Sequence, residues 1–238
     1  MLNKYTFRSI ALAVVLATAP FAYAQKAGDI IGFVGGAYIA PNASLGATNS
    51  VGPASIPFNA ALAGSSASIG GVSTVTLSAL YMVTDHIAGE FTIGLPPKLT
   101  LDVQLASGAH PGAATANALT PSLIGKYLFN DPKDALRPYL GIGVSYVSFS
   151  NVSANTSDPL IANLAGSSAS LSSSWAPVFN AGMLYNINDR WSINGSISYV
   201  PAKTDFTFVG AGAGTGTTTT GTLALNPMEY VLRVGYKF

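Results

Sequence analysis

The last nine residues of the chain alternate strictly between two kinds of side chain. Tyr230, Leu232, Val234, Tyr236 and Phe238 fall on one face of an extended chain, whereas Val231, Arg233, Gly235 and Lys237 fall on the other. Because successive side chains of a β-strand point to opposite faces, this pattern predicts a strand with one aromatic, apolar face and one face that carries both cations. A wall between lipid and a polar interior requires this division.

Seven further segments are predicted to be strands. They are residues 29–40, 75–83, 87–95, 119–129, 139–149, 175–187 and 191–199. The alternation is clear in 191–199, where Trp191, Ile193 and Ile197 interleave with serines and an asparagine, and it is ambiguous in 29–40, where both faces are apolar or glycine. The segments therefore total eight.

The connections between these segments alternate in length. Short ones (84–86, 130–137 and 188–190) are separated by long ones rich in small residues (41–72, 96–118, 151–174 and 209–222). Outer-membrane barrels have short periplasmic turns and long outer loops, so the sequence predicts an all-β, eight-stranded antiparallel transmembrane β-barrel. A secreted β-sandwich is the alternative, and its outward aromatic faces would make it poorly soluble. Strand extensions of 41–72 above the membrane remain an option.

Composition and the N-terminus agree with export to a membrane. Only 9% of the residues are charged, against about 25% in a soluble domain. Basic residues Lys4 and Arg8, an apolar stretch and Ala22-Tyr23-Ala24 form the three parts of a secretory signal. We therefore predict a cleaved signal at 1–24 and a barrel at 25–238. Since no second long apolar run follows, a helical membrane protein is excluded.

Several short motifs lie at the ends of the predicted strands. They are residues 80–87 (LYMVTDHI) with Glu90, 137–146 (RPYLGIGVSY) with Phe149, 174–175 (SW), 181–182 (AG), 188–191 (NDRW), 198–199 (SY), 225–227 (LNP) and 235–238 (GYKF). Together they resemble the outer-membrane protein W (OmpW) family, from about Ala27 to the end, whereas the long connections do not match. At residues 226–228 the chain has Asn-Pro-Met, where the family more usually has Asp-Pro-Trp.

The resemblance implies a bacterial outer-membrane protein with a narrow, largely apolar lumen that takes up small hydrophobic molecules, including alkanes. In the mechanism that it implies, the ligand enters from outside, is held in the lumen and leaves sideways through a gap in the wall into the lipid. The expected partners are outer-membrane lipid, the barrel-assembly machinery and a small hydrophobic ligand. The oligomeric state is left open.

Candidate lumen residues for such a ligand are Leu223 and Leu225, which face inward near the outer end of the last strand. Phe206 and Phe208 join them if the facing of their strand slips near Pro201. An eight-stranded barrel is nearly filled by side chains, so it can hold a slender ligand and cannot be a wide aqueous porin.

Four charged residues fall on inward faces: Glu90, Lys126, Arg233 and Lys237. Buried charges need partners. We expect Glu90 to pair with Lys126 on the neighbouring strand, with Arg233 across the lumen from this pair. The group is either a set of structural ion pairs that plugs the lower lumen or a selectivity device.

Three prolines mark one place in the predicted wall. Pro96 and Pro97 end the third strand, and Pro121 lies near the start of the fourth. Because proline cannot donate to the hydrogen-bond ladder, the missing bonds could leave a lateral gap between these strands. The commoner alternative is that the prolines merely end strands.

The aromatic residues Tyr230, Tyr236 and Phe238 are in phase on the last strand. They resemble the terminal signal that the barrel-assembly machinery reads. The alternative is a last strand with a purely structural role.

The sequence shows little that would support catalysis. It contains no cysteine, and we expect His86 in a periplasmic turn and His110 in an outer loop, so that a Ser-His-Asp arrangement is not expected. No metal, cofactor or nucleic acid is indicated. The sequence therefore predicts a transport barrel rather than an enzyme. The alternatives are a closed structural or interaction barrel whose outer loops bind a partner and, less favoured, a lipid-acting enzyme.

Overall fold

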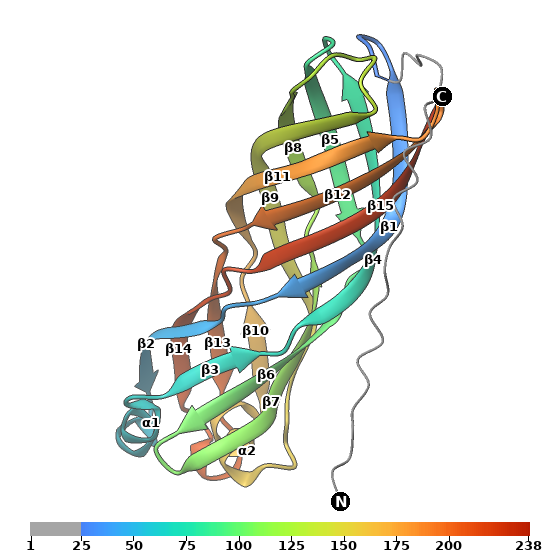
Figure 1. The fold of residues 1–238 in the computed structure, drawn as a ribbon. Coiled ribbons are helices and arrows are strands. Elements are labelled where there is room, and N and C mark those ends of the chain that lie inside the picture. The colour runs from blue at the N-terminus through green and yellow to red at the C-terminus, as the bar shows by residue number, and fades with distance from the viewer. Residues whose placement is uncertain (1–24) are drawn as a thin grey trace, which may run out of the picture.

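The computed structural model describes residues 25–238, so the predicted signal at 1–24 lies outside the described residues. Eight antiparallel strands close into one ring, in which the last strand pairs with the first (Figure 1). They are β1 (Ile30–Ala40), β4 (Val72–Met82), β5 (Ile87–Gly94), β8 (Ser122–Leu128), β9 (Leu136–Ala154), β11 (Ser174–Asn186), β12 (Trp191–Tyr199) and β15 (Met228–Lys237). The predicted eight-stranded antiparallel barrel is confirmed.

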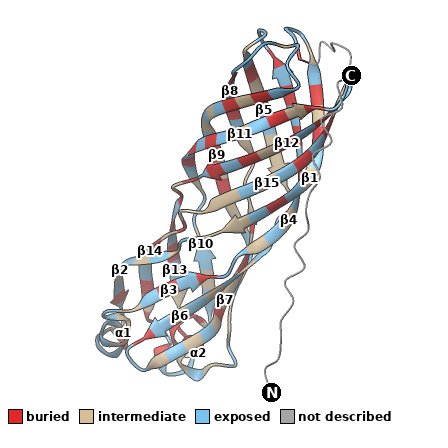
Figure 2. Cartoon of the chain, in the orientation of Figure 1, coloured by how far each residue is buried: buried red, intermediate tan, exposed pale blue. Residues whose placement is uncertain are grey.

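The barrel is apolar outside and polar inside. Leu232 is 66% exposed and Ile142 is 65% exposed on the outer face, whereas Arg233 and Asn194 are buried. Buried and exposed residues accordingly alternate along the strands in Figure 2. A wall of this kind is stable when lipid covers the apolar face. Within residues 25–238, no helix has the length and apolar character needed to cross a bilayer.

The long connections fold into a second tier at the end opposite the C-terminus (Figure 1). One sheet contains β3 (Ser66–Ile69), β6 (Lys98–Leu105), β7 (Gly108–Leu119) and the outer part of β9. The other contains β10 (Ser168–Leu171), β13 (Lys203–Val209), β14 (Thr218–Ala224) and β2 (Ser44–Val51). About half of the residues in the long connections are therefore in strands. Residues 99–105 show why, since four apolar side chains alternate with polar ones there.

Short helices close the outer end of this tier. They are α1 (Ser55–Leu62), α2 (Pro159–Ala165) and the 3₁₀ turn η1 (Gly212–Gly214). Helix α2 begins at Asp158, whose side chain accepts hydrogen bonds from the backbone N–H groups of Leu160 and Ile161. Phe58 of α1 and Leu164 of α2 pack with Leu105, so both helices are anchored on one apolar cluster.

The last predicted strand is divided in two. We placed Leu223 and Leu225 on it, but Leu223 lies in β14, which ends at Ala224, and Leu225 lies in the link to β15. Asn226 adopts a positive φ of 38°, and Pro227 follows it. The left-handed backbone and the missing donor of proline break the ladder at this point.

The end of the barrel near the C-terminus is closed by Arg137. Its side chain is fully buried, and its guanidinium donates to the backbone carbonyls of Gln25 and Asp85. The Gln25 side chain donates to Asn186. These contacts fill the periplasmic mouth with polar side chains.

Candidate functional site: an apolar chamber above a polar lumen

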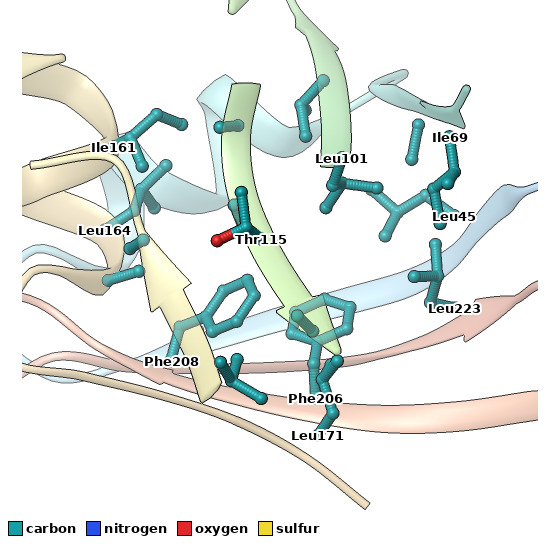
Figure 3. Close-up of a pocket in the computed structure, with 18 of the residues that line it drawn as sticks. Leu45, Ile69, Leu101, Thr115, Ile161, Leu164, Leu171, Phe206, Phe208 and Leu223 are labelled. Atoms are coloured by element: carbon teal, nitrogen blue, oxygen red, sulfur yellow. The ribbon is translucent and has the colours of Figure 1, made fainter. Parts of the chain in front are cut away.

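An apolar chamber of about 100 Å³ lies inside the second tier. The four residues that we predicted to bind a ligand line this chamber. Phe206 and Phe208 of β13 are stacked with ring centres 4.7 Å apart, near Leu223 of β14 (Figure 3). Leu225 contributes from the link that follows β14. Apart from Thr115 and Thr219, the chamber lining is aliphatic or aromatic. An apolar cavity of about 150 Å³ in another protein stays dry and binds benzene, so a chamber of this chemistry suits a slender apolar molecule.

Much of the chamber comes from connections that the sequence prediction treated as loops. Leu45, Ile69, Leu101, Ile161 and Leu164 contribute from β2, β3, β6 and α2 (Figure 3). The alternating pattern of residues 98–105 could have revealed Leu101. No comparable pattern marks Ile161 or Leu164, because only the fold of α2 over the barrel turns them inward.

A buried ion cluster lies deeper in the lumen. Lys126 Nζ lies 2.6 Å from Glu90 Oε2, and Arg233 Nη1 lies 2.8 Å from Glu90 Oε1. Arg233 extends from β15, which is separated from β5 by β1 and β4 in the ring, and its long side chain reaches the pair and contacts Glu90 directly. Lys237 lies apart from this cluster, 3.3 Å from Asp29.

Neutral groups make further contacts with these charges, although Arg233 Nε is buried without a hydrogen-bond partner. Arg233 donates to Ser78 Oγ at 2.7 Å and to Asn194 Oδ1 at 2.8 Å, and Lys126 Nζ lies 4.3 Å from the centre of the Tyr139 ring. The cluster thus spans the lumen from several strands. Together with Arg137 it leaves two polar layers between the chamber and the periplasmic end.

A second cavity of about 50 Å³ lies between the chamber and the ion cluster. Its lining includes Glu229, Asn180 and Thr76, together with Pro97 and Thr120 from the wall. The sequence prediction omitted Glu229 and Asn180, although Glu229 is in phase with inward-facing Val231 and Arg233. The two cavities follow one another along the strands, since Leu99 and Ala116 line the chamber whereas Pro97 and Ala118 line the second cavity.

The hydrogen-bond ladder of the wall is interrupted beside this second cavity. Pairing of β5 with β8 ends at Thr92–Ser122, and pairing of β6 with β7 begins at Lys98–Asn117. Pro96, Pro97 and Pro121 all lie between these two points. Single bonds link Ala118 N to the Pro97 carbonyl at 3.2 Å and the Asn117 side chain to the Pro96 carbonyl at 3.2 Å.

Side chains near the turn between β6 and β7 make a series of contacts that we did not expect. Ser107 Oγ lies 3.2 Å from His110 Nε2, and His110 Nδ1 lies 2.6 Å from Asp158 Oδ2. The expectation that no Ser-His-Asp arrangement would form is therefore wrong, since folding of α2 against β7 brings Asp158 to His110. The hydrogen bond from His110 lowers the pKa of Asp158, and the backbone N–H groups of Ile161 and Leu160 add to this effect. Ser107 is exposed, so we interpret the chain as a link between β7 and α2.

The C-terminal aromatic residues lie on the lipid face. Phe238 is 83% exposed and packs edge-on against Tyr236, with ring centres 5.3 Å apart. Tyr230 lies 6.5 Å from Tyr38 of β1. These rings contribute to the outer surface and not to the lumen.

A closed eight-stranded barrel with an apolar exterior, short turns at one end and long folded connections at the other is a small bacterial outer-membrane β-barrel. The comparisons give the family. The OmpW family model matches residues 26–238, and the chain belongs to this family.

Named relatives agree with this assignment. The chain is 26% identical over 237 residues to outer membrane protein W of Salmonella typhimurium, with full coverage of both chains. It is 30% identical over 147 residues to outer membrane protein AlkL of Ectopseudomonas oleovorans, with 62% of this chain and 60% of that protein covered. The crystal structure of OprG from Pseudomonas aeruginosa is similar in fold, with a TM-score of 0.79, 24% identity and coverage of 91% and 99%.

Proposed function

We propose that the protein carries small hydrophobic molecules across the outer membrane, by binding them in the apolar chamber and releasing them sideways into lipid. The observation that carries this proposal is the chamber, whose lining is apolar except for Thr115 and Thr219. The uptake of hydrophobic molecules that the OmpW resemblance implies agrees with it.

The chamber can supply enough free energy for weak to moderate binding. Burial of one CH₂ group contributes about 0.8 kcal/mol, so an eight-carbon alkane gains roughly 6 kcal/mol before the cost of association is subtracted. The gross gain by itself corresponds to a Kd of about 40 µM, and the cost of association makes the binding weaker than this value. Such a ligand can be captured and also released.

The route out of the chamber follows from what surrounds it. The Glu90 cluster and Arg137 lie between the chamber and the periplasmic mouth, and an apolar molecule cannot pass them without separating buried charges. The interrupted ladder at Pro96, Pro97 and Pro121 has few hydrogen bonds to break. Sideways exit at this point is therefore the less costly path.

A closed structural or interaction barrel is the second candidate. The observation in its favour is the roof of α1 and α2, whose apolar side chains pack together over the chamber. In that case the outer tier would bind a partner and the chamber would be only a packing void.

Binding of a medium-chain alkane to the refolded barrel, followed by displacement of a fluorescent probe, separates these candidates. A variant with both Leu223→Asp and Leu225→Asp should lose saturable binding, because an unpaired carboxylate is costly in an apolar chamber. The matched control, Leu223→Met with Leu225→Met, preserves volume and apolar character and should still bind. Absence of binding by the folded wild type would favour the closed barrel.

Sideways release can be tested by locking the wall. The chain contains no cysteine, so a Leu95→Cys, Leu119→Cys variant, at positions in phase with lipid-facing Phe91 and Leu123 on the same two sides of the interruption, can be joined across it with a short bis-maleimide. Joining Phe91→Cys to Leu123→Cys, a pair in register within the intact ladder, is the matched control. The first cross-link should slow transfer of a bound alkane into vesicles and the second should not. Equal transfer in both would contradict exit at this point.

We also infer that Tyr230, Tyr236 and Phe238 form the segment that the barrel-assembly machinery reads. Their phase on β15 and the high exposure of Phe238 support this assignment.

A further inference from the structure

The cavity between the chamber and the ion cluster contains a carboxylate without a partner. Glu229 points inward from β15 beside Ser198 of β12 and Ile39 of β1, and it lines this cavity. Across residues 25–238, no hydrogen bond or ion pair reaches the Glu229 carboxylate. Lys126 and Arg233 line the same cavity and share Glu90 as their anion, so this cluster keeps one positive charge in excess, but neither cation forms an ion pair with Glu229.

Two more oxygen atoms in this cavity lack partners. Asn180 Oδ1 and Thr76 Oγ1 are buried without a hydrogen bond, and each residue is only 6% exposed. The Asn180 Nδ2 group donates to the Ile197 carbonyl at 3.3 Å and to Ser198 Oγ at 2.9 Å, which fixes the amide so that its oxygen stays unpaired. Buried polar groups in proteins are nearly always satisfied, so both atoms favour a polar guest. Asn180 Oδ1 can only accept a hydrogen bond and therefore favours a donor, whereas the Thr76 hydroxyl can accept or donate.

A ligand can reach both cavities at once. Pro97 lines the second cavity and Leu99 lines the chamber, and two residues of a strand span about 7 Å. An alkyl chain in the chamber would therefore place its end group among Glu229, Asn180 and Thr76. A volume of about 50 Å³ holds a small head group.

We propose that the second cavity selects hydrophobic molecules that carry one hydrogen-bond-donating head group, alkylamines and alkanols, over alkanes and carboxylates. This proposal rests on the proposed function of the chamber. Glu229 and Asn180 accept from an ammonium or hydroxyl group, whereas they offer no donor to a carboxylate, and Glu229 repels it. An alkane leaves the Glu229 carboxylate, Asn180 Oδ1 and Thr76 Oγ1 unsatisfied.

The test compares four probes of equal chain length: decane, decanol, decylamine and decanoate, each displacing a fluorescent probe from the barrel in zwitterionic detergent. We expect decylamine to bind about tenfold more tightly than decane, which corresponds to one charge-assisted hydrogen bond. Decanol should be intermediate and decanoate weakest. In Glu229→Leu the advantage of decylamine should disappear while decane binding is retained.

Controls keep this result interpretable. Ser196→Ala changes another residue of the same cavity and carries no charge, so it should keep the preference. Asn180→Leu removes a second acceptor and should reduce the preference independently of Glu229. Heat-dependent electrophoretic mobility reports whether each variant is folded.

Different results would overturn the head-group proposal and the chamber proposal. Equal binding of all four probes by the wild type, or the tightest binding by decanoate, would overturn head-group selection and leave the chamber proposal standing. Absence of binding by any probe would overturn both. A preference that survives in both folded variants, Glu229→Leu and Asn180→Leu, would also overturn the selection by these residues.

Discussion

Glu90 holds two cations at once in the middle of the barrel. Its two carboxylate oxygens contact Lys126 and Arg233 separately, at 2.6 and 2.8 Å, and Thr92 donates to the same carboxylate at 2.8 Å. At this depth a charge without a partner is costly. The three residues therefore depend on one another unequally, since only the anion is shared.

Substitutions in this cluster should reveal the unequal dependence. Glu90→Gln leaves two buried cations without an anion and should lower the free energy of unfolding by about 3–5 kcal/mol. Lys126→Met should cost less, because Arg233 still neutralises Glu90. Urea unfolding in lipid vesicles measures both, and Asp29→Asn, at the rim, should cost about 1 kcal/mol or less. A larger effect of Lys126→Met than of Glu90→Gln would contradict the shared-anion arrangement.

In the outer tier, Asp158 is the acidic residue whose contacts make the stability depend on pH. Because its pKa is lowered in the folded protein, its contribution to stability is present above the pKa of the unfolded chain and is lost as the pH falls through the folded value. The amide signals of Leu160 and Ile161 should titrate with a midpoint below the ordinary aspartate value of about 3.9. In Asp158→Asn, which keeps the capping oxygen, they should not titrate. A wild-type midpoint at or above the ordinary value would exclude the His110 link.

Among the secondary-structure elements, the strands differ in how completely they are hydrogen-bonded to their neighbours. Strands β1, β12 and β15 pair continuously and close the barrel, whereas the β5–β6 and β7–β8 junctions leave the wall incompletely bonded. Prolines produce this difference because they lack a backbone donor. The prolines that end these strands therefore also determine where the wall has the fewest backbone hydrogen bonds.

Deletion of Phe238 tests whether the end of β15 acts as an assembly signal. The ring is largely exposed, so its loss should change the stability of the refolded barrel by less than about 1 kcal/mol. In cells, the folded fraction in the outer membrane should fall several-fold if the assembly machinery reads this residue. Heat-dependent mobility of membrane fractions measures that fraction, and Phe238→Tyr, which keeps an aromatic end, is the control. Normal assembly of the deletion would contradict the signal role.

At the scale of the whole molecule, two tiers with opposite chemistry share one ring of strands. The membrane tier is apolar outside and polar inside, whereas the outer tier encloses the apolar chamber. Strand β9 runs through both tiers. The apolar chamber therefore lies above the polar layers of the lumen.

These polar layers predict a poor aqueous channel. Arg137→Ala alone should leave ion conductance in planar bilayers unchanged, because the Glu90 cluster still fills the lumen. Combining Arg137→Ala with Glu90→Ala, Lys126→Ala and Arg233→Ala removes both layers and should raise conductance clearly. A large conductance in the wild type, or in Arg137→Ala, would show that the cluster does not close the lumen.

The barrel could be predicted from the sequence alone. Lipid and lumen impose opposite demands on successive side chains, so the period of two, together with alternating loop lengths, defines eight strands and their facing. The inward charges Glu90, Lys126 and Arg233 were predictable for the same reason, as was the position of the three prolines at one place in the wall.

The tertiary structure alone decided how the outer connections fold and what they enclose. Ile161, Leu164, Phe206 and Phe208 become neighbours only because strands from different connections pair above the membrane, and small-residue segments do not specify such long-range pairing. The contact of Arg233 with Glu90 depends on side-chain reach, and the contact of His110 with Asp158 on the docking of α2. Alternation records which way a side chain points, and only the assembled fold determines which side chains it meets.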